Sequence, residues 1–110
     1  MTVTCNGQPA RVEDLLPALV NYGHFTSLQV RGHAAQGLDL HLARLSQATR
    51  ELFGSELDAA QVQAWMALAV RQSGQADASL RVTVYSRHFD FRNPLAEVPV
   101  DVLVAVSAPV

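Results

Sequence analysis

Arg44 is the side chain in this sequence best placed to bind a phosphate group. It lies in the first turns of a helix predicted over residues 38–52, and an extended segment, residues 22–30, precedes that helix. A guanidinium presents a fixed fork of hydrogen-bond donors, and the first N–H groups of a helix have no partner within it, so a phosphate is favoured there. The helical periodicity alone also fits a solvated arginine that does no more than pair with an acid.

Lysine and metal-binding clusters are missing from the sequence. The chain contains no lysine, so it cannot hold an aldehyde as a Schiff base on a lysine amine of its own. The histidines have neither helical i, i+4 spacing nor a cysteine partner, which argues against zinc. No Ser/His/Asp arrangement, glycine-rich phosphate loop or paired-carboxylate motif occurs. We expect all four histidines at the surface or at polar edges: His24, His33, His41 and His88.

The chain is predicted to begin with a β-hairpin. Residues 2–5 alternate as a strand, Asn6-Gly7 is a strong signal for a two-residue turn, and residues 8–11 form the returning strand. Residues 12–21 are expected to be a connection with at most one helical turn. The reason is Pro17, which removes a backbone donor and disfavours helix in the residue before it.

A second hairpin and an amphipathic helix follow. Residues 25–30 are predicted as a strand that turns at Arg31-Gly32 and returns over residues 33–36. Apolar positions spaced by four and three residues then predict one buried helix face, and Gly54 is the expected C-cap. The positions on this face are Leu38, Leu42, Leu45, Thr49 and Leu52.

A second helix and two strands complete the predicted fold. Asp58 is suited to be the N-cap of a helix that ends at Gly74, with Gln61 three residues on in a capping-box-like position. Residues 79–85 alternate, and residues 98–106 are nearly all apolar, as in a strand buried on both faces. The expected fold is α+β in two layers, a largely antiparallel sheet with two helices packed on one face.

Composition excludes several classes of protein. Hydrophobic residues make up 49% and charged residues 16% of the 110 residues, which is typical of one folded globular domain. The formal charge of −2 provides no field that favours nucleic acid or an anionic membrane. No apolar run approaches the ~20 residues of a membrane span. Cys5 is the only cysteine and the start lacks a secretory pattern, so we expect a cytoplasmic protein.

The segment around Arg44 resembles the amino-terminal domain of class IV pyridoxal-phosphate enzymes. That group holds branched-chain and D-amino-acid aminotransferases and aminodeoxychorismate lyase. The resemblance rests on His41-Leu42-Ala43-Arg44-Leu45 after a strand and turn, and on the helix continuing through Arg50-Glu51-Leu52-Phe53-Gly54. It extends from Asn6-Gly7 to Ala108-Pro109, and it implies that Arg44 binds the phosphate of pyridoxal phosphate.

The resemblance adds two candidates for a substrate pocket. Arg81 stands where similar sequences carry an arginine that helps bind a substrate carboxylate in some members. Its alternative is an outward-facing strand residue, since Leu80 and Val82 occupy the opposite face. Tyr22, followed by Gly23, resembles the family's Tyr-Gly segment and implies a place in the pocket; packing at the strand entrance is its alternative.

The resemblance implies half of an active site. An absent carboxy-terminal domain would supply the lysine, the acid at the pyridine nitrogen and most phosphate contacts, for amino-group transfer or a related lyase step on an amino acid. We therefore expect residues 1–110 to be a single domain, an amino-terminal lobe that is inactive alone. It would associate, in a homo-oligomer, through surface that the missing domain or a twin subunit covers. A free-standing α+β interaction domain without catalysis is the alternative from another class.

Overall fold

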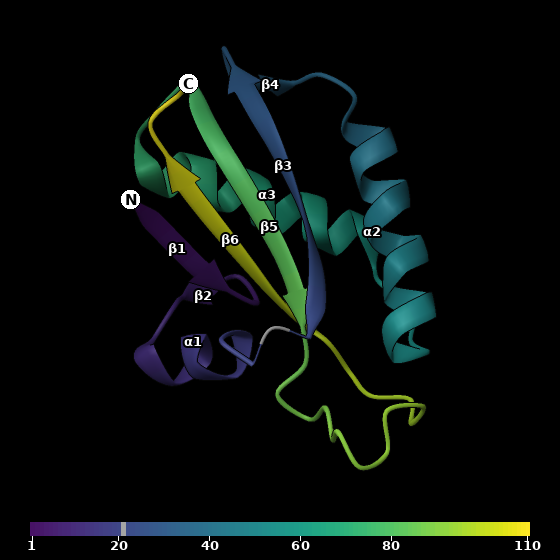
Figure 1. The fold of residues 1–110 in the computed structure, drawn as a ribbon. Helices are drawn as coiled ribbons and strands as arrows, with labels where there is room; N and C mark the ends of the chain where they lie inside the picture. The colour runs from purple at the N-terminus through teal and green to yellow at the C-terminus, as the bar shows by residue number, and fades with distance from the viewer. Residues whose placement is uncertain (21) are drawn as a thin grey trace.

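The computed structural model describes residues 1–20 and 22–110, and in these residues the chain forms six strands and three helices. The strands make one sheet in the order β2-β1-β6-β5-β3-β4, with every neighbouring pair antiparallel (Figure 1). The predicted α+β class is confirmed. The elements are β1 (Thr2–Cys5), β2 (Gln8–Pro9), α1 (Val12–Ala18), β3 (Gly23–Arg31), β4 (Ala34–Ala35), α2 (Leu38–Phe53), α3 (Ala59–Ser73), β5 (Ala78–Tyr85) and β6 (Asp101–Ser107).

Helices α2 and α3 cover one face of the sheet (Figure 1). Because side chains alternate along a strand, Leu80, Val82 and Val84 of β5 all point to this face, and each is at most 2% exposed. They share one core with Leu45 of α2 and Met66 of α3. The two-layer arrangement with two helices on one face is therefore confirmed.

The opposite face of the sheet is covered only in part. Cys5, Tyr85 and Leu103 form a small second core there, and Ala18 of α1 packs against it. Farther along the same face, Phe25 of β3 is 55% exposed. This face therefore holds the open surface of the sheet.

Two tight turns set the hairpin registers. Asn6-Gly7 has φ angles of 51° and 79°, as a type I′ turn requires, and the first predicted hairpin is confirmed. Its returning strand, expected over residues 8–11, ends at Pro9, because Arg11 already caps α1. The second turn is Gly32-His33, with φ angles of 56° and 63°. It falls one residue later than predicted because Arg31 still pairs with Ala34.

The predicted helix ends are confirmed by the backbone. Gly54 and Gly74 follow α2 and α3 with φ angles of 69° and 73°, the left-handed conformation that closes a helix and that glycine adopts without a steric penalty. The Oδ1 atom of Asp58 accepts a hydrogen bond from the backbone N–H of Gln61 at 3.0 Å, as an N-cap does. Arg44 consequently lies in the second turn of a regular helix.

The expectation of a connection with at most one helical turn before β3 is wrong. Residues Val12–Ala18 form α1, with Pro17 inside its last turn. The helix persists because the Asp14 carboxylate accepts the backbone N–H of Arg11 at 2.9 Å, and because Tyr85 donates its hydroxyl to the Asp14 carbonyl at 2.7 Å. Tertiary contacts thus override the local proline signal. The last residue of that predicted connection, Asn21, lies outside the described residues.

The predicted strand over residues 98–106 also needs correction, since β6 begins at Asp101. The backbone N–H of Val98 donates to the Phe53 carbonyl at 3.2 Å. The Ser86 hydroxyl donates to the Pro99 carbonyl at 2.7 Å. The segment before β6 is thus held by the end of α2 and by the start of the β5–β6 loop.

No described helix has the length and apolarity needed to cross a bilayer. No group of three or more metal-ligating side chains from histidine, cysteine, aspartate and glutamate occurs in the same part of the chain.

Candidate functional site

A hollow of about 150 Å³ opens where β3 begins and β5 ends. It joins two of the three predicted site residues, Tyr22 and Arg81, and it does not include Arg44. The register explains the meeting of the two strands, because Gly23 pairs with Tyr85 and Phe25 pairs with Thr83. The lining residues are Tyr22, Gly23, His24, Phe25, Arg81, Thr83 and Tyr85.

Arg81 provides the positive charge of this hollow. It lies on β5 with its side chain on the open face, and its guanidinium carbon is 3.8 Å from the centre of the Phe25 ring. Such stacking is a favourable cation–π contact. Among the described residues, Arg81 makes no side-chain hydrogen bond or ion pair, so its N–H groups remain available for a carboxylate.

Tyr22 is fixed by packing on three sides. Its ring stacks on Phe89 with centroids 3.8 Å apart and meets the edge of Phe53 at 5.5 Å. Its hydroxyl donates to the Leu52 carbonyl at 3.1 Å. These contacts favour the packing role at the strand entrance, while the ring also forms one wall of the hollow.

Arg44 lies apart from the hollow, on the solvent side of α2. Leu42 and Leu45 are buried on the core face of the helix, whereas Arg44 is exposed. Within the described part of the chain its side chain has no hydrogen bond or ion pair. The guanidinium is therefore open to an anion, and its role as a phosphate ligand stays a prediction.

Two hydrogen bonds between histidine and threonine fasten α2, the helix of Arg44, to β3. Thr26 Oγ1 and His41 Nδ1 are 2.7 Å apart. His24 Nε2 lies 2.9 Å from Thr49 Oγ1, and the Thr49 hydroxyl donates to a carbonyl one turn earlier in α2. Because that hydroxyl proton is already used, His24 holds its proton on Nε2 and donates it to Thr49.

The expectation that all histidines lie at the surface or at polar edges is wrong for His24 and His41, which are half-buried between β3 and α2. Burial lowers the pKa of His24, since the charged imidazolium loses its water. The sequence did contain a usable signal. Every second position of β3 holds one of His24, Thr26 and Leu28, and that spacing places all three on the helix-covered face.

An ionic network adjoins Tyr85, one of the residues that line the hollow, and the sequence did not predict it. Arg87 Nε lies 3.1 Å from Asp101 Oδ1, and Arg87 Nη2 lies 3.2 Å from Asp14 Oδ1. The negative charge of Asp101 raises the pKa of Arg87. The hydrogen bond from the Arg11 backbone, with further help from Arg87, lowers the pKa of Asp14. Arg87 and Asp14 are 73 residues apart in sequence, so no local pattern could have found this pair.

Tyr85 connects this network to the floor of the hollow. The Tyr85 hydroxyl, which donates to the Asp14 carbonyl, is 3.5 Å from the Cys5 sulfur. Burial raises the pKa of both the Tyr85 phenol and the Cys5 thiol, so both groups stay protonated at neutral pH. The pair is a structural support for the hollow.

Comparison with known proteins identifies the fold. No family model matches the sequence, and no curated protein matches it either. Solved structures do match. A branched-chain amino acid aminotransferase from Escherichia coli aligns with a TM-score of 0.77 and 16% identity, over 97% of this chain and 40% of that one. The predicted likeness in fold is confirmed.

Two further structures extend the comparison. The 4-amino-4-deoxychorismate lyase from Pseudomonas aeruginosa has a TM-score of 0.74 and 23% identity, over 96% of this chain and 39% of that one. A hypothetical aminotransferase from Mycobacterium tuberculosis, with α-ketoglutarate and PMP bound, has a TM-score of 0.71 and 24% identity, over 98% and 40%. The chain therefore spans about two fifths of the length of these structures. At such identities the likeness establishes the fold alone.

Proposed function

We propose that this chain is the amino-terminal lobe of a pyridoxal-phosphate-dependent, aminotransferase-like enzyme that acts on amino acids in the cytoplasm. The observation that carries the proposal is the fold match, which extends over 97% of this chain and 40% of an aminotransferase. The hollow with Arg81 supports it, because an arginine without an ionic partner is suited to a substrate carboxylate. The proposal includes two reactions, amino-group transfer and a related lyase step.

The side chains present fit part of a pyridoxal-phosphate site. Arg44 is an exposed guanidinium without an ionic partner among the described residues, which suits the cofactor phosphate. The chain has no lysine, so a further domain has to provide the amine that holds the cofactor aldehyde. When bound, pyridoxal phosphate supplies an electron sink for chemistry at the α carbon.

The lobe's own contribution is to bind and orient the substrate. Arg81 would pair with the substrate carboxylate, and Phe25 restrains its guanidinium by stacking. Tyr22 forms a wall that excludes water beside it. None of these residues transfers a proton or forms a covalent bond, so we expect the isolated lobe to be inactive.

A docking surface for the remainder of the enzyme is part of the proposal. The outer side of α1 exposes Val12 and Leu16 by 72% and 58%, and Leu19, directly after the helix, is 76% exposed. Phe91 and Leu95 of the β5–β6 loop are 65% and 95% exposed. Exposed apolar side chains gathered on one helix are typical of an interaction surface. We assign this surface to the carboxy-terminal domain or to a twin subunit of a homo-oligomer.

The free-standing interaction domain is the second candidate, and the same exposed side of α1 favours it. The two candidates differ in what the gene encodes after Val110. A continuous reading frame of about one further domain, on the order of 150 residues, with a lysine just before a strand supports the enzyme. A stop codon at that point eliminates it.

A spectroscopic experiment tests the cofactor chemistry of the chain itself. Mixed with pyridoxal phosphate, the protein should give no internal aldimine absorbance, since it contains no lysine. The α-amino group is blocked in the control sample, because it can also form a Schiff base. An absorbance band that survives this blocking would contradict the assignment.

A further inference from the structure

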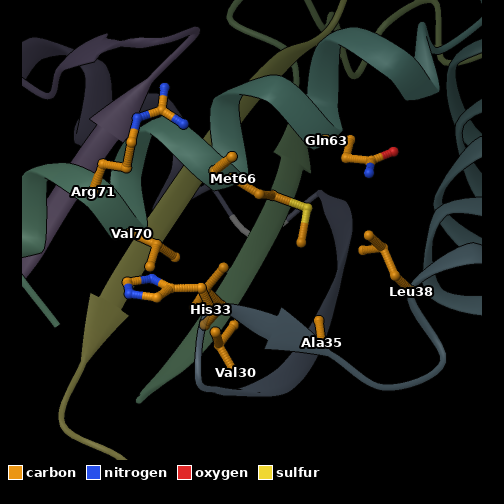
Figure 2. Close-up of a pocket in the computed structure, with 10 residues that line it drawn as sticks. Val30, His33, Ala35, Leu38, Gln63, Met66, Val70 and Arg71 are labelled. Atoms are coloured by element: carbon orange, nitrogen blue, oxygen red, sulfur yellow. The ribbon is translucent and has the colours of Figure 1, made fainter. Parts of the chain in front are cut away.

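A second cavity, of about 420 Å³, lies on the helix-covered side of the sheet (Figure 2). Its floor consists of Val30, Met66, Val70 and Leu80, which are at most 7% exposed. Leu38, at the start of α2, closes it on one side (Figure 2). A volume of this size and an apolar lining are typical of a site for a small organic ligand.

The side of the groove that His33 forms is held by hydrogen bonds within the chain. The backbone N–H of His33 donates to the Ala76 carbonyl at 3.0 Å. The backbone N–H of Gly32 donates to Asp77 Oδ1 at 2.8 Å. Together they tie the β3–β4 turn to the segment that leads into β5. The turn that carries His33 is thus held in place by the chain's own bonds, which lowers the entropic cost of binding.

The polar groups of the groove are unevenly distributed. His33 and Arg71 lie at one side of the opening, and Gln63 and Leu38 lie at the other (Figure 2). Within residues 1–20 and 22–110, neither the Arg71 guanidinium nor the His33 ring makes a hydrogen bond or an ion pair. The apolar floor therefore ends beside two hydrogen-bond donors, one of them permanently charged.

The groove is separate from the hollow at Arg81. Val30 and Leu80 point toward α2 and α3, whereas Arg81 points to the opposite side of β5. The two cavities have no lining residue in common. Occupation of the groove is therefore independent of the proposed enzyme, and either assignment can fail without the other.

We propose that this groove is a binding site for an elongated apolar monocarboxylate, such as a medium-chain fatty acid. The alkyl chain lies on Met66, Val70 and Leu80, and the carboxylate lies at the end of the groove beside His33, where the exposed Arg71 side chain can turn toward it. Charge complementarity selects this occupant, because the permanently charged group that lines the groove is the Arg71 guanidinium, which has no ionic partner among the described residues, whereas Gln63 at the other side is uncharged. Asp77, the nearby carboxylate, is engaged by the Gly32 backbone.

The test is a titration of the whole chain with sodium decanoate below its micelle concentration. The Met66 methyl resonance reports binding, and Met1, the only other methionine, serves as the internal control. We expect a saturable shift at Met66 alone. Arg71→Gln should weaken binding by on the order of tenfold, whereas Arg50→Gln, a change in the last turn of α2, should leave it unchanged.

A second variant separates site occupation from surface adsorption. Ala67 is exposed at the rim of the groove on α3, so Ala67→Leu adds bulk to the opening without entering the core. We expect this variant to keep the wild-type circular dichroism and melting temperature and to lose the Met66 shift. 1-Decanol, which lacks the charge, should bind less tightly than decanoate by a factor similar to the loss in Arg71→Gln.

Three outcomes would overturn the proposal. One is a Met66 shift that does not saturate. Another is an equal loss of affinity in Arg71→Gln and Arg50→Gln. The third is a dimer in sedimentation that Ala67→Leu dissociates, which would make the groove a contact between two copies of the chain.

Discussion

The guanidinium carbon of Arg81 lies 3.8 Å from the centre of the Phe25 ring. The two residues are diagonal neighbours on adjacent strands, because Arg81 pairs with Ser27 and Phe25 pairs with Thr83. The ring face attracts the cation and restrains a long side chain at the mouth of the hollow. Phe25 is thus a positioning residue for the one arginine of the candidate site.

Phe25→Leu should release Arg81 without unfolding the protein. The ring is more than half exposed, so we expect a loss of less than about 1 kcal/mol in the free energy of unfolding. The Arg81 Nε–H resonance should move away from its ring-shielded position and sharpen, because the side chain gains freedom. Phe91→Leu is the control, since Phe91 is 65% exposed but does not stack on Arg81. An unchanged Arg81 resonance in Phe25→Leu would refute the positioning role.

Gly7→Ala should destabilise the fold strongly. An added Cβ would clash with Trp65 Nε1, so the indole of α3 must move. The φ of +79° adds backbone strain. From the two effects together we expect the free energy of unfolding, measured in urea, to fall by about 2 to 4 kcal/mol.

Gly32→Ala is the matched control for Gly7→Ala. Gly32 also occupies a hairpin turn at positive φ, 56°, but nothing lies within 4 Å of its added Cβ. The free energy of unfolding of Gly32→Ala should therefore fall by the backbone strain alone, about 1 kcal/mol. Equal losses in the two variants would show that the contact with Trp65 contributes nothing.

The sequence was sufficient for elements whose signals are local. Gly54, Gly74 and the Asp58 cap set the helix ends, and the turn at Asn6-Gly7 set the first hairpin. It was insufficient for α1, since much of the support of that helix at Asp14, from Tyr85 and Arg87, comes from residues more than 70 positions away. The candidate site shows the same difference between features with local signals and features that depend on distant residues.

The types of the site residues could be predicted, but their grouping could not. Arg81 and Tyr22 were found by resemblance, yet their shared hollow depends on the register of β3 with β5. Phe25 escaped notice because its stacking on Arg81 is a cross-strand contact that only this register creates. Separation in sequence explains these omissions.

Asp14→Asn should make the free energy of unfolding less dependent on pH in the acid range. Contacts with the Arg11 backbone and with Arg87 lower the folded-state pKa of Asp14. They stabilise the protein above the unfolded pKa of about 3.9, and this contribution disappears as the pH falls through the lower folded value. The variant should be less stable at pH 7 and lose less on acidification. Urea midpoints between neutral and acid pH measure both effects, and exposed Glu13, changed to Gln, is the control.

His24→Gln should change the pH dependence of the free energy of unfolding in a different pH range. Burial lowers the folded-state pKa of His24, so below its unfolded value of about 6.5 the unfolded chain binds more protons. Wild-type stability should therefore fall as the pH drops from that value through the folded pKa. The variant should lack this step. His88→Gln, at an exposed position, should retain it, and a step that persists in His24→Gln would require another group.

Arg44→Ala tests the proposed phosphate contact in the full-length parent. A charge-assisted hydrogen bond is worth ~1.5 to 3 kcal/mol, so the dissociation constant for the cofactor should rise by on the order of ten- to a hundredfold. Equilibrium dialysis with pyridoxamine phosphate measures it without a Schiff base. Arg50→Ala changes an exposed arginine two turns farther along α2, which pairs at 3.4 Å with Glu56, and should leave the affinity unchanged. Equal affinities in the two variants would remove Arg44 from the site, while the fold of the lobe would stand, because Arg44 supports no contact of the core.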